Sequence, residues 1–183
     1  MGKVIVIQFI TLDGVVEDPD GRGGTEFGGW AFRFGPEAIA GDKFRLGPIL
    51  ETGALLFGHR TWEHFSRLWP SRTDPFSTAM NKIEKYVVSH AAPDLSTWPP
   101  STLLSGDLVD AVRHLARERD LVIIGSHSVV RELTAAEAVD EYRLLTFPTV
   151  VGQGIQLFTN PAKLRLISVE MVGQASLTIY SAR

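Results

Sequence analysis

Two glycine turns, each lying between an apolar run and a helical pattern, carry the polar groups best suited to chemistry. The first is Gly58-His59-Arg60-Thr61, after the apolar run 54–57, and the second is Gly125-Ser126-His127-Ser128, after the run 121–124. The start of a helix offers N–H groups without partners and a partial positive charge, and glycine lets the backbone come close to a ligand. Arginine adds a planar donor fork that suits phosphate. The two turns together indicate a site for the phosphates of one dinucleotide.

Each turn also has a plainer interpretation. Gly58–Thr61 could be an ordinary strand-to-helix turn with an exposed arginine, and Gly125–Ser128 a glycine turn followed by serines that cap a helix. Ser89-His90 follows another strand-like run. Either of these two residues could contact a nucleotide 2′-phosphate, or the pair could simply begin a loop.

Two carboxylates are candidates for donating or relaying a proton. Asp13 follows the first apolar run, in Thr11-Leu12-Asp13-Gly14, where it could orient a substrate or relay a proton. It could equally bond the backbone of its own turn. Asp42 falls within the first predicted helix, where a solvated role is the alternative.

Several other kinds of site are excluded or not indicated. There is no cysteine, which excludes disulfides, thiolate catalysis and cysteine metal sites. His59 and His64 are five positions apart and would lie on different faces of a helix, so no metal site is predicted. The chain lacks a P-loop, a serine-hydrolase elbow and the usual G-x-G-x-x-G fingerprint after its first strand.

Composition predicts one globular domain over residues 1–183. The chain has 183 residues, 44% of them hydrophobic and 21% charged. The formal charge is 18 − 21 = −3, which does not suggest a nucleic-acid partner. The short apolar start gives no indication of a membrane helix or a signal peptide, and the chain is expected to be cytoplasmic.

Apolar runs and turn residues predict the order of the elements. Strands are predicted over 3–10, 54–57, 85–89, 102–104, 121–124 and 141–151, followed by a hairpin of 164–172 and 176–181. Helices are predicted over 36–52 (kinked or split at Gly47-Pro48), 59–67, 107–119 and 129–133. The glycine-rich segment 13–35 is predicted to be a long loop whose aromatic residues pack against another part of the protein. This order predicts an α/β layered domain with a mostly parallel sheet and an antiparallel C-terminal hairpin.

Six motifs, in this order, resemble the dihydrofolate reductase-like superfamily, most closely the reductase domain of riboflavin biosynthesis and its stand-alone relatives. They are Thr11–Gly14, Gly58–Glu63, Tyr86–Ser89, Ile124–Ser128, Val139–Leu144 and Phe147–Gly154. The resemblance extends from Lys3 to the final strand. It implies a three-layer αβα sandwich, NADPH as cofactor and, often, a homodimer.

The resemblance also implies roles for individual residues. Cofactor phosphate would be held by Gly58, His59, Arg60 and Thr61, the 2′-phosphate by Ser89 and His90, and the diphosphate by Gly125, Ser126, His127, Ser128 and Val129. Residues 12–16, with Leu12 and Gly14, would lie near the nicotinamide, and Gly152 and Gly154 in a further loop near the cofactor. The loop 15–34, with Trp30 and Phe34, would cover the pocket.

Two features depart from the family pattern. A small residue is more usual at the position of His127, and a positive φ there would strain the backbone. A set of substrate-binding residues cannot be aligned, and Asp42 is only the nearest candidate, by spacing, for the acid that dihydrofolate reductase carries on its first helix.

The function expected is an NADPH-dependent reductase that transfers hydride to a C=N or C=O bond of a small heterocyclic or ribosyl-pyrimidine-like substrate, similar to 5-amino-6-(5-phosphoribosylamino)uracil reductase. The alternative is a domain of the same fold that binds a nucleotide or other small ligand without turnover. No nucleic-acid or membrane partner is expected.

Overall fold

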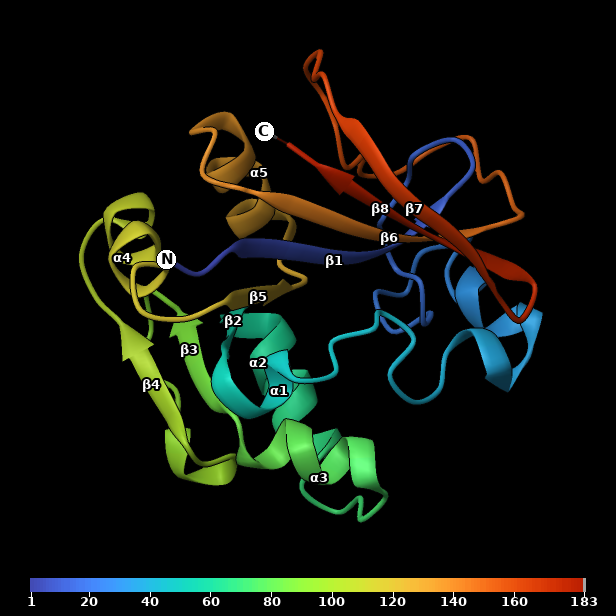
Figure 1. The fold of residues 1–183 in the computed structure, drawn as a ribbon. Helices are drawn as coiled ribbons and strands as arrows, with labels where there is room; N and C mark the ends of the chain where they lie inside the picture. The colour runs from blue at the N-terminus through green and yellow to red at the C-terminus, as the bar shows by residue number, and fades with distance from the viewer. Residues whose placement is uncertain (183) are drawn as a thin grey trace. The chain divides into compact units, whose positions relative to one another are not determined.

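A computed structural model describes residues 1–182 (Figure 1). The contacts within the chain divide it into two compact units. Unit 1 is made of Met1–Val6 and Leu46–Asp140, and unit 2 of Ile7–Arg45 and Glu141–Arg183. Each unit therefore combines two separate stretches of sequence. The single domain expected over residues 1–183 stays a prediction.

The strands form a mixed sheet with the order β4-β3-β2-β5-β1-β6-β8-β7. Their bounds are β1 Val4–Thr11, β2 Ala54–Gly58, β3 Glu84–Val88, β4 Ser101–Leu104, β5 Leu121–Ile124, β6 Glu141–Phe147, β7 Arg165–Val172 and β8 Ala175–Ser181. Strand β2 pairs in parallel with β3 and β5, and β3 in parallel with β4. Strand β8 pairs antiparallel with β6 and β7. The predicted fold class, mostly parallel with an antiparallel C-terminal hairpin, is confirmed.

Unit 1 contains five α-helices within the described residues. They are α1 Ile49–Thr52, α2 His59–Leu68, α3 Pro75–Lys82, α4 Leu108–Leu115 and α5 His127–Ala135, with a 3-10 turn at Leu95–Thr97. Helix α1 contacts α3, and α4 contacts α5. The chain moves from β2 to β3 and β4 on one side and returns to β5 on the other, so right-handed crossovers place α4 on the face opposite α2.

Capping residues explain where two of these helices begin. The Asp107 carboxylate accepts from Asp110 N–H (3.0 Å), as expected of an N-cap, although α4 ends at Leu115 and not at 119. Helix α3 was not predicted, yet its start carries two standard signals. Asp74 caps it by accepting from Ser77 N–H (3.0 Å), and Pro75 occupies its first turn.

Trp30 and Phe34 of segment 13–35 pack in unit 2, as predicted, whereas Phe32 is 54% exposed. The Phe147 ring lies 5.2 Å from Phe9 and 5.7 Å from both Trp30 and Phe34, between ring centroids. Trp30 begins a 3-10 helix, Trp30–Phe34. Strand β6 ends at Phe147 and not at 151, because Pro148 has no N–H for the strand ladder.

Of the helix predicted over 36–52, the part before the predicted break at Gly47-Pro48 is wrong, and only the part after it is α-helical. A short 3-10 helix covers Pro36–Ala38, and regular helix resumes only at Ile49, in α1. The segment between them is irregular, and Asp42 lies in a bend. The candidate acid Asp42 is therefore not on a helix.

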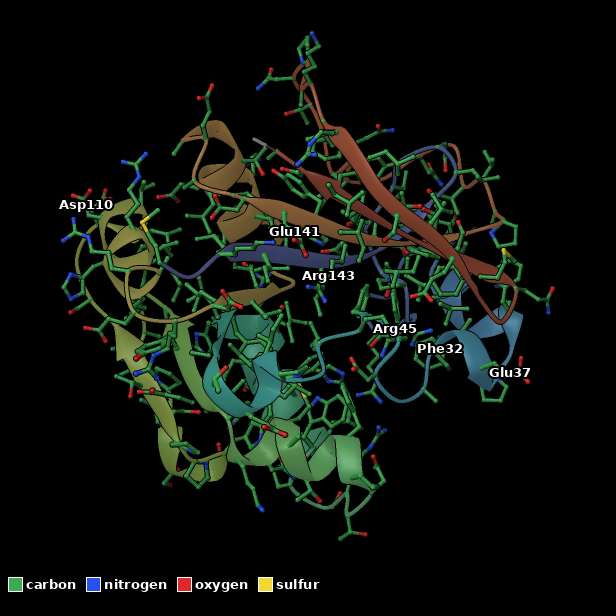
Figure 2. All side chains as sticks on the ribbon, viewed as in Figure 1. Phe32, Glu37, Arg45, Asp110, Glu141 and Arg143 are labelled. Atoms are coloured by element: carbon green, nitrogen blue, oxygen red, sulfur yellow. The ribbon has the colours of Figure 1, made fainter. Side chains whose placement is uncertain are left out.

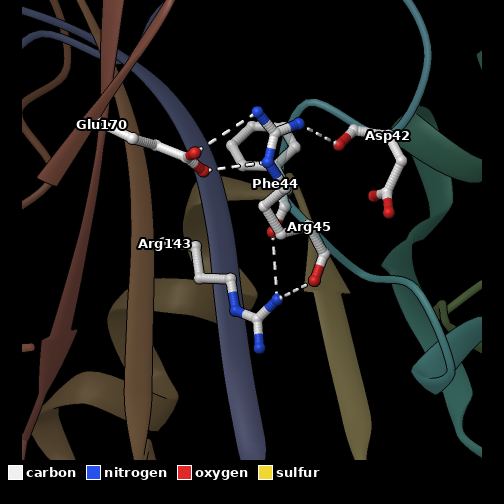
Figure 3. A network of polar contacts seen from close by, with 5 residues as sticks. All are labelled: Asp42, Phe44, Arg45, Arg143 and Glu170. Carbon is white, nitrogen blue, oxygen red and sulfur yellow. Dashed lines mark hydrogen bonds and ion pairs between the residues drawn. The ribbon is translucent and has the colours of Figure 1, made fainter. Parts of the chain in front are cut away.

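Arg143 on β6 holds this irregular segment in place (Figure 3). Its guanidinium donates to the carbonyls of Phe44 (3.0 Å) and Arg45 (2.5 Å). In a helix those carbonyls would accept from N–H groups four residues later, so the arginine competes with helix formation. Arg45 has a φ of 55°, which also breaks a helix, and its side chain pairs with Glu170 (2.9 Å). Glu141 completes the network by pairing with Arg143 at 2.7 Å, and both lie on β6 in Figure 2.

Within residues 1–182, every helix is too short or too polar to cross a bilayer.

A buried lysine in unit 1, Lys85, donates its hydrogen bonds to backbone carbonyls. The Lys85 ammonium donates to the carbonyls of Ile83 (2.7 Å) and Asn81 (3.0 Å) and lies 4.7 Å from the centre of the Trp98 ring. Lys85 is fully buried, and burial lowers its pKa from 10.5 to about 8. Keeping the Lys85 ammonium charged in the folded protein at neutral pH therefore lowers the free energy of unfolding.

We predict that the free energy of unfolding rises with pH because of Lys85. Below about pH 8 the lysine is protonated in both the folded and unfolded states, whereas between pH 8 and 10.5 the unfolded chain binds more protons, so deprotonation favours folding. The free energy of unfolding from urea titrations should increase by about 2 kcal/mol between pH 7 and 9.5, relative to Lys85→Met. Equal pH dependence in the two proteins would contradict this prediction.

Candidate nucleotide site

The ends of three neighbouring strands of unit 1 carry the turns predicted to bind phosphate. Strand β2 lies between β3 and β5 and is parallel to both, so the three carboxyl ends share one edge. Gly58 ends β2, Ser89 follows β3 and Gly125 follows β5. Ligands of open α/β sheets bind beyond this edge. The fold thus brings together three segments that are far apart in the sequence.

The turn after β5 lies against the end of β2 at a distance that only glycine allows. A Cβ built on Gly58 would lie 2.2 Å from Ser126 Oγ and 2.3 Å from Ser126 Cβ. The φ of Gly58 is −76°, an ordinary value, so glycine is needed here for space and not for conformation.

The backbone of the second turn is strained at Ser126. Its φ of 59° is rare for a residue with a side chain, and Gly125 before it also has a positive φ, 62°. Ser126 N–H donates to Thr61 Oγ1 (3.2 Å), which ties the turn to the first turn of α2. His127 begins α5 and is not among the residues with positive φ, so the strain considered for His127 lies one residue earlier. Such strain is common at ligand-binding segments.

Helix α5 directs the N–H groups of its first turn at this edge of the sheet. Val130 N–H closes the first helical bond, to the Ser126 carbonyl (3.0 Å). The N–H groups before it are the ones that a helix leaves for an anion. Ser128 is exposed and can offer its hydroxyl, which lies 2.9 Å from Ser126 Oγ. Val129 is buried, so only its backbone could reach a ligand.

A side-chain hydrogen bond joins the end of β3 to the start of α2. Ser89 Oγ lies 2.9 Å from His59 Nδ1 and also accepts from Ala91 N–H (3.0 Å). The contact with Ser89 fixes the orientation of the His59 ring, so His59 would present its other ring nitrogen, Nε2, to a ligand. His90, the next residue after Ser89, is exposed.

The charge at the start of α2 favours an anion. Arg60 is exposed, and within residues 1–182 it has no ion-pair partner. The carboxylate one turn away, Glu63, is already paired with Arg67 (2.7 Å). Arg60 and the positive end of the α2 dipole therefore both attract an anion.

In unit 2, Asp13 holds the loop after β6 against the turn after β1. Its carboxylate accepts from the Thr11 hydroxyl (2.5 Å), Gly152 N–H (2.7 Å) and Val151 N–H (3.3 Å). The Thr11 hydroxyl, with help from these N–H groups, lowers the pKa of Asp13 below its ordinary value. An ionised carboxylate is a poor proton donor at neutral pH. These contacts favour an anchoring role, and a catalytic role for Asp13 stays a prediction.

Further contacts run along the same two segments of unit 2. Backbone hydrogen bonds join Leu12 N–H to Thr149 O, Val16 N–H to Ile155 O and Leu157 N–H to Gly14 O, at 2.9 to 3.0 Å. Ile155 N–H also donates to the Glu17 carboxylate (3.0 Å). Gly154 has a φ of 112°, and a Cβ there would lie 2.9 Å from Val15 Cγ1. Leu12, in contrast, leaves its side chain 65% exposed.

The segment expected to cover the pocket is organised by the buried carboxylate of Asp18. This group accepts from Gly23 N–H (2.6 Å), Thr25 N–H (2.9 Å) and Thr25 Oγ1 (2.8 Å). Burial alone would raise the pKa of Asp18, but the hydrogen bonds from Thr25 and Gly23 lower it overall. A Cβ on Gly28 would lie 2.2 Å from Asp18 Oδ2, so the loop closes tightly on this carboxylate.

Trp30 fastens the end of that segment. Its ring is fully buried, and its indole N–H donates to the Glu17 carbonyl (2.9 Å). Phe34 is half-buried. Roles for Trp30 and Phe34 in a lid stay predictions, and the buried Trp30 ring could serve a lid only by holding its base.

The sequence analysis missed Thr11, Glu17 and Asp18 as organising residues. Asp18 had a local signal, because Asp-Pro-Asp-Gly is typical of a turn whose aspartate accepts backbone N–H groups. Thr11 also bonds locally, to Asp13 and Val15, as a turn threonine does. Glu17 had no local signal, because its partner Ile155 lies 138 residues away. Over the described part of the chain, no three His, Asp or Glu side chains are grouped to hold a metal ion.

Comparison with known proteins identifies relatives along nearly the whole chain. Residues 2–178 match the family described as the RibD C-terminal domain. The uncharacterized protein YwjB of Bacillus subtilis (strain 168) is 26% identical over 178 residues, which cover 94% of each chain.

Solved structures share the fold. A protein from Shewanella sp. PV-4, assigned provisionally to riboflavin biosynthesis, superposes with a TM-score of 0.72 at 19% identity, over 98% of both chains. The diaminohydroxyphosphoribosylaminopyrimidine deaminase/5-amino-6-(5-phosphoribosylamino)uracil reductase of Thermotoga maritima superposes with a TM-score of 0.60 at 19% identity. The match covers 98% of the present chain but 56% of that protein.

We predict that Gly58→Ala destabilises unit 1 and that Ser126→Gly largely reverses the effect. The added methyl collides with Ser126 Oγ and Cβ, and removing that side chain removes both atoms while suiting the positive φ. Gly58→Ala should cost about 1–3 kcal/mol in the free energy of unfolding. A double-mutant cycle by urea denaturation measures the coupling, and additive effects would contradict the proposed contact.

We predict that Asp13→Asn loosens the loop after β6. The amide loses the charge that two backbone N–H groups and a hydroxyl stabilise. Hydrogen exchange at Val151 and Gly152 should become about tenfold faster or more. The control is Asp20→Asn, a change at a carboxylate paired with exposed Arg22 (3.8 Å). Unchanged exchange in Asp13→Asn would show that Asp13 is not the anchor.

Proposed function

We propose, from the chain's membership of the RibD C-terminal domain family, that this protein is an NADPH-dependent reductase. The substrate we propose is a small heterocyclic or ribosyl-pyrimidine-like compound with a reducible C=N or C=O bond. The Thermotoga maritima relative carries 5-amino-6-(5-phosphoribosylamino)uracil reductase in its name, which supports this class. A place in riboflavin biosynthesis is part of the same proposal.

One observation carries the proposal: the close contact of Gly58 with Ser126 at the edge of the unit 1 sheet. It brings the starts of α2 and α5 together, so the N–H groups of two helices point to the same region. A dinucleotide carries a diphosphate and, in NADPH, a third phosphate, and the residues present suit those groups. Gly125 to Val129 would hold the diphosphate through backbone N–H groups and serine hydroxyls.

The adenosine 2′-phosphate is assigned to the neighbouring start of α2. Arg60, which has no ion-pair partner within residues 1–182, supplies a permanent positive charge, and His59 supplies a ring nitrogen oriented by Ser89. Ser89 and His90 lie at the end of β3, beside the same turn. This cluster would distinguish NADPH from NADH, which lacks the phosphate.

The bound cofactor would supply the hydride, and the protein would fix its position and exclude water. Within unit 2, residues Leu12 to Val16 are assigned to the nicotinamide, following the family resemblance. Asp13 would keep Gly152 and its loop in place for this purpose.

A second candidate is a domain that binds a nucleotide without turnover. The observation that favours it is the state of Asp13, whose lowered pKa leaves it without a proton to donate at neutral pH. Incubation with NADPH and a panel of pyrimidine, imine and carbonyl substrates separates the two. Substrate-dependent loss of absorbance at 340 nm would support the reductase, and binding of NADPH with no turnover of any compound would support the binding domain.

We predict that Arg60→Ala weakens NADPH about tenfold while leaving NADH nearly unchanged. The loss corresponds to about 1.4 kcal/mol for one charged contact with phosphate. Calorimetric titration of both cofactors measures it. The control is Arg67→Ala, at the other end of the same helix, where the arginine is already paired with Glu63. Equal losses for NADPH and NADH would remove the 2′-phosphate role from Arg60.

A further inference from the structure

Gln8 on β1 is a buried amide without a hydrogen-bond partner. Its side chain is 8% exposed, and within residues 1–182 it makes no hydrogen bond to another residue. An unpaired buried amide destabilises a folded protein, and native proteins keep few of them. Among the side-chain polar atoms of the described chain, Trp69 Nε1 alone is both wholly enclosed and unpaired, so the Gln8 amide keeps some access to solvent. A small polar group can therefore reach Gln8.

Gln8 shares one face of the unit 2 sheet with Thr146 on β6. Strands β1 and β6 are neighbours in the sheet (Figure 1). The rings of Phe9 and Phe147 meet on the opposite face, 5.2 Å apart between centroids. Side chains alternate between faces along a strand, and Gln8 and Thr146 each come one residue before one of these phenylalanines. Both therefore point to the face that the phenylalanines leave.

A second buried polar side chain, Thr178 on β8, lies on the same face. Its partner across the strand pair is Leu144, two residues before Thr146. Thr178 is 8% exposed and Thr146 is half-buried, and within residues 1–182 neither hydroxyl makes a hydrogen bond. Strands β1, β6 and β8 are consecutive in the sheet, so Gln8 and Thr178 lie about 10 Å apart. That width suits one small planar group.

The strands contribute no charged side chain to this face. Along β6 and β8 it consists of three aligned pairs, Tyr142 with Tyr180, Leu144 with Thr178, and Thr146 with Ser176. The opposite face carries the ion pair of Glu141 and Arg143. An ionised ligand group would lose its hydration here without gaining a partner of opposite charge. The group that fits is therefore uncharged.

The chemistry of Gln8 narrows that group further. Its side-chain amide holds an NH₂ donor and a carbonyl acceptor next to each other. A carboxamide or a ring lactam holds the same two groups, so two hydrogen bonds can form side by side between them. A ketone lacks the donor, and a carboxylate lacks the donor and carries a charge.

We propose that Gln8 binds a neutral amide-type group of the ligand, a carboxamide or a ring lactam, at a site lined by the hydroxyls of Thr146 and Thr178. The inference rests on the proposed function, because NADPH carries a carboxamide on its nicotinamide ring and a pyrimidine substrate carries a lactam. Strand β1 leads from Gln8 directly into residues 12–16, the segment assigned to the nicotinamide. Both sources share the chemistry that Gln8 recognises.

The first test needs no ligand. Gln8→Met keeps an unbranched side chain of similar length and removes the unpaired amide, so the melting temperature should rise by a few degrees. The matched control is Gln174→Met, in the exposed turn between β7 and β8, which should melt with the wild type. A lower melting temperature for Gln8→Met would mean that the amide is paired within the protein, and would overturn the inference.

The second test identifies the ligand group. Calorimetry measures the affinity for NADPH and for its 3-acetylpyridine analogue, in which a methyl group replaces the amide nitrogen, and an NMR titration measures the affinity for uracil. If Gln8 binds the carboxamide, the wild type should prefer NADPH to the analogue about tenfold, and Gln8→Met should lose that preference. If it binds a lactam, Gln8→Met should weaken uracil about tenfold and leave the cofactors unchanged.

The outcomes separate this inference from the proposed function. A Gln8→Met protein with wild-type affinity for NADPH, the analogue and uracil would overturn the role of Gln8, whatever the enzyme reduces. A wild type that binds uracil through Gln8 and neither cofactor would overturn the NADPH-dependent reductase and support the role of Gln8. A wild type that binds none of the three would overturn both.

Discussion

The close approach of Gly58 to Ser126 is the constraint on which the candidate nucleotide site depends. Two helices can direct their N–H groups to one place only if the turns before them touch, and a single Cβ at position 58 would prevent it. At the same place Ser126 has a positive φ and its N–H donates to Thr61 Oγ1. Space at Gly58 therefore permits the close approach of a strained turn 68 positions later in the chain.

Unit 2 shows a different constraint, in which a side chain outcompetes a helix. The segment from Pro36 to Thr52 has composition that favours helix between its glycines, yet the Arg143 guanidinium takes the carbonyls of Phe44 and Arg45. The arginine is itself held by Glu141, largely away from solvent, where ionic hydrogen bonds are strong. A local preference worth tenths of a kcal/mol per residue is easily overridden by such a group.

This contrast marks what the sequence could predict. The strands, the C-terminal hairpin and the helices α2, α4 and α5 follow from local apolar patterns and caps, and the meeting of the three polar turns follows from parallel topology. The failed first part of the helix predicted over 36–52 and the anchors formed by Asp13 and Glu17 depend on partners about 100 or more residues away, for which one sequence has no signal. Helix α3 is a different case, because Asp74 and Pro75 are local sequence signals for the start of a helix.

The acids of unit 2 bear on the proposed chemistry as a group. Asp13, Glu17 and Asp18 each accept hydrogen bonds from backbone N–H groups of loops, and the pKa values of Asp13 and Asp18 are lowered. All three carboxylates fix loops, and the lowered pKa values of Asp13 and Asp18 keep those two ionised at neutral pH. Hydride transfer to a C=N or C=O bond still requires a proton, and a water molecule ordered by the substrate or by the backbone can deliver it without any of these acids. A reductase built on this chain is therefore expected to owe its rate to positioning more than to acid catalysis.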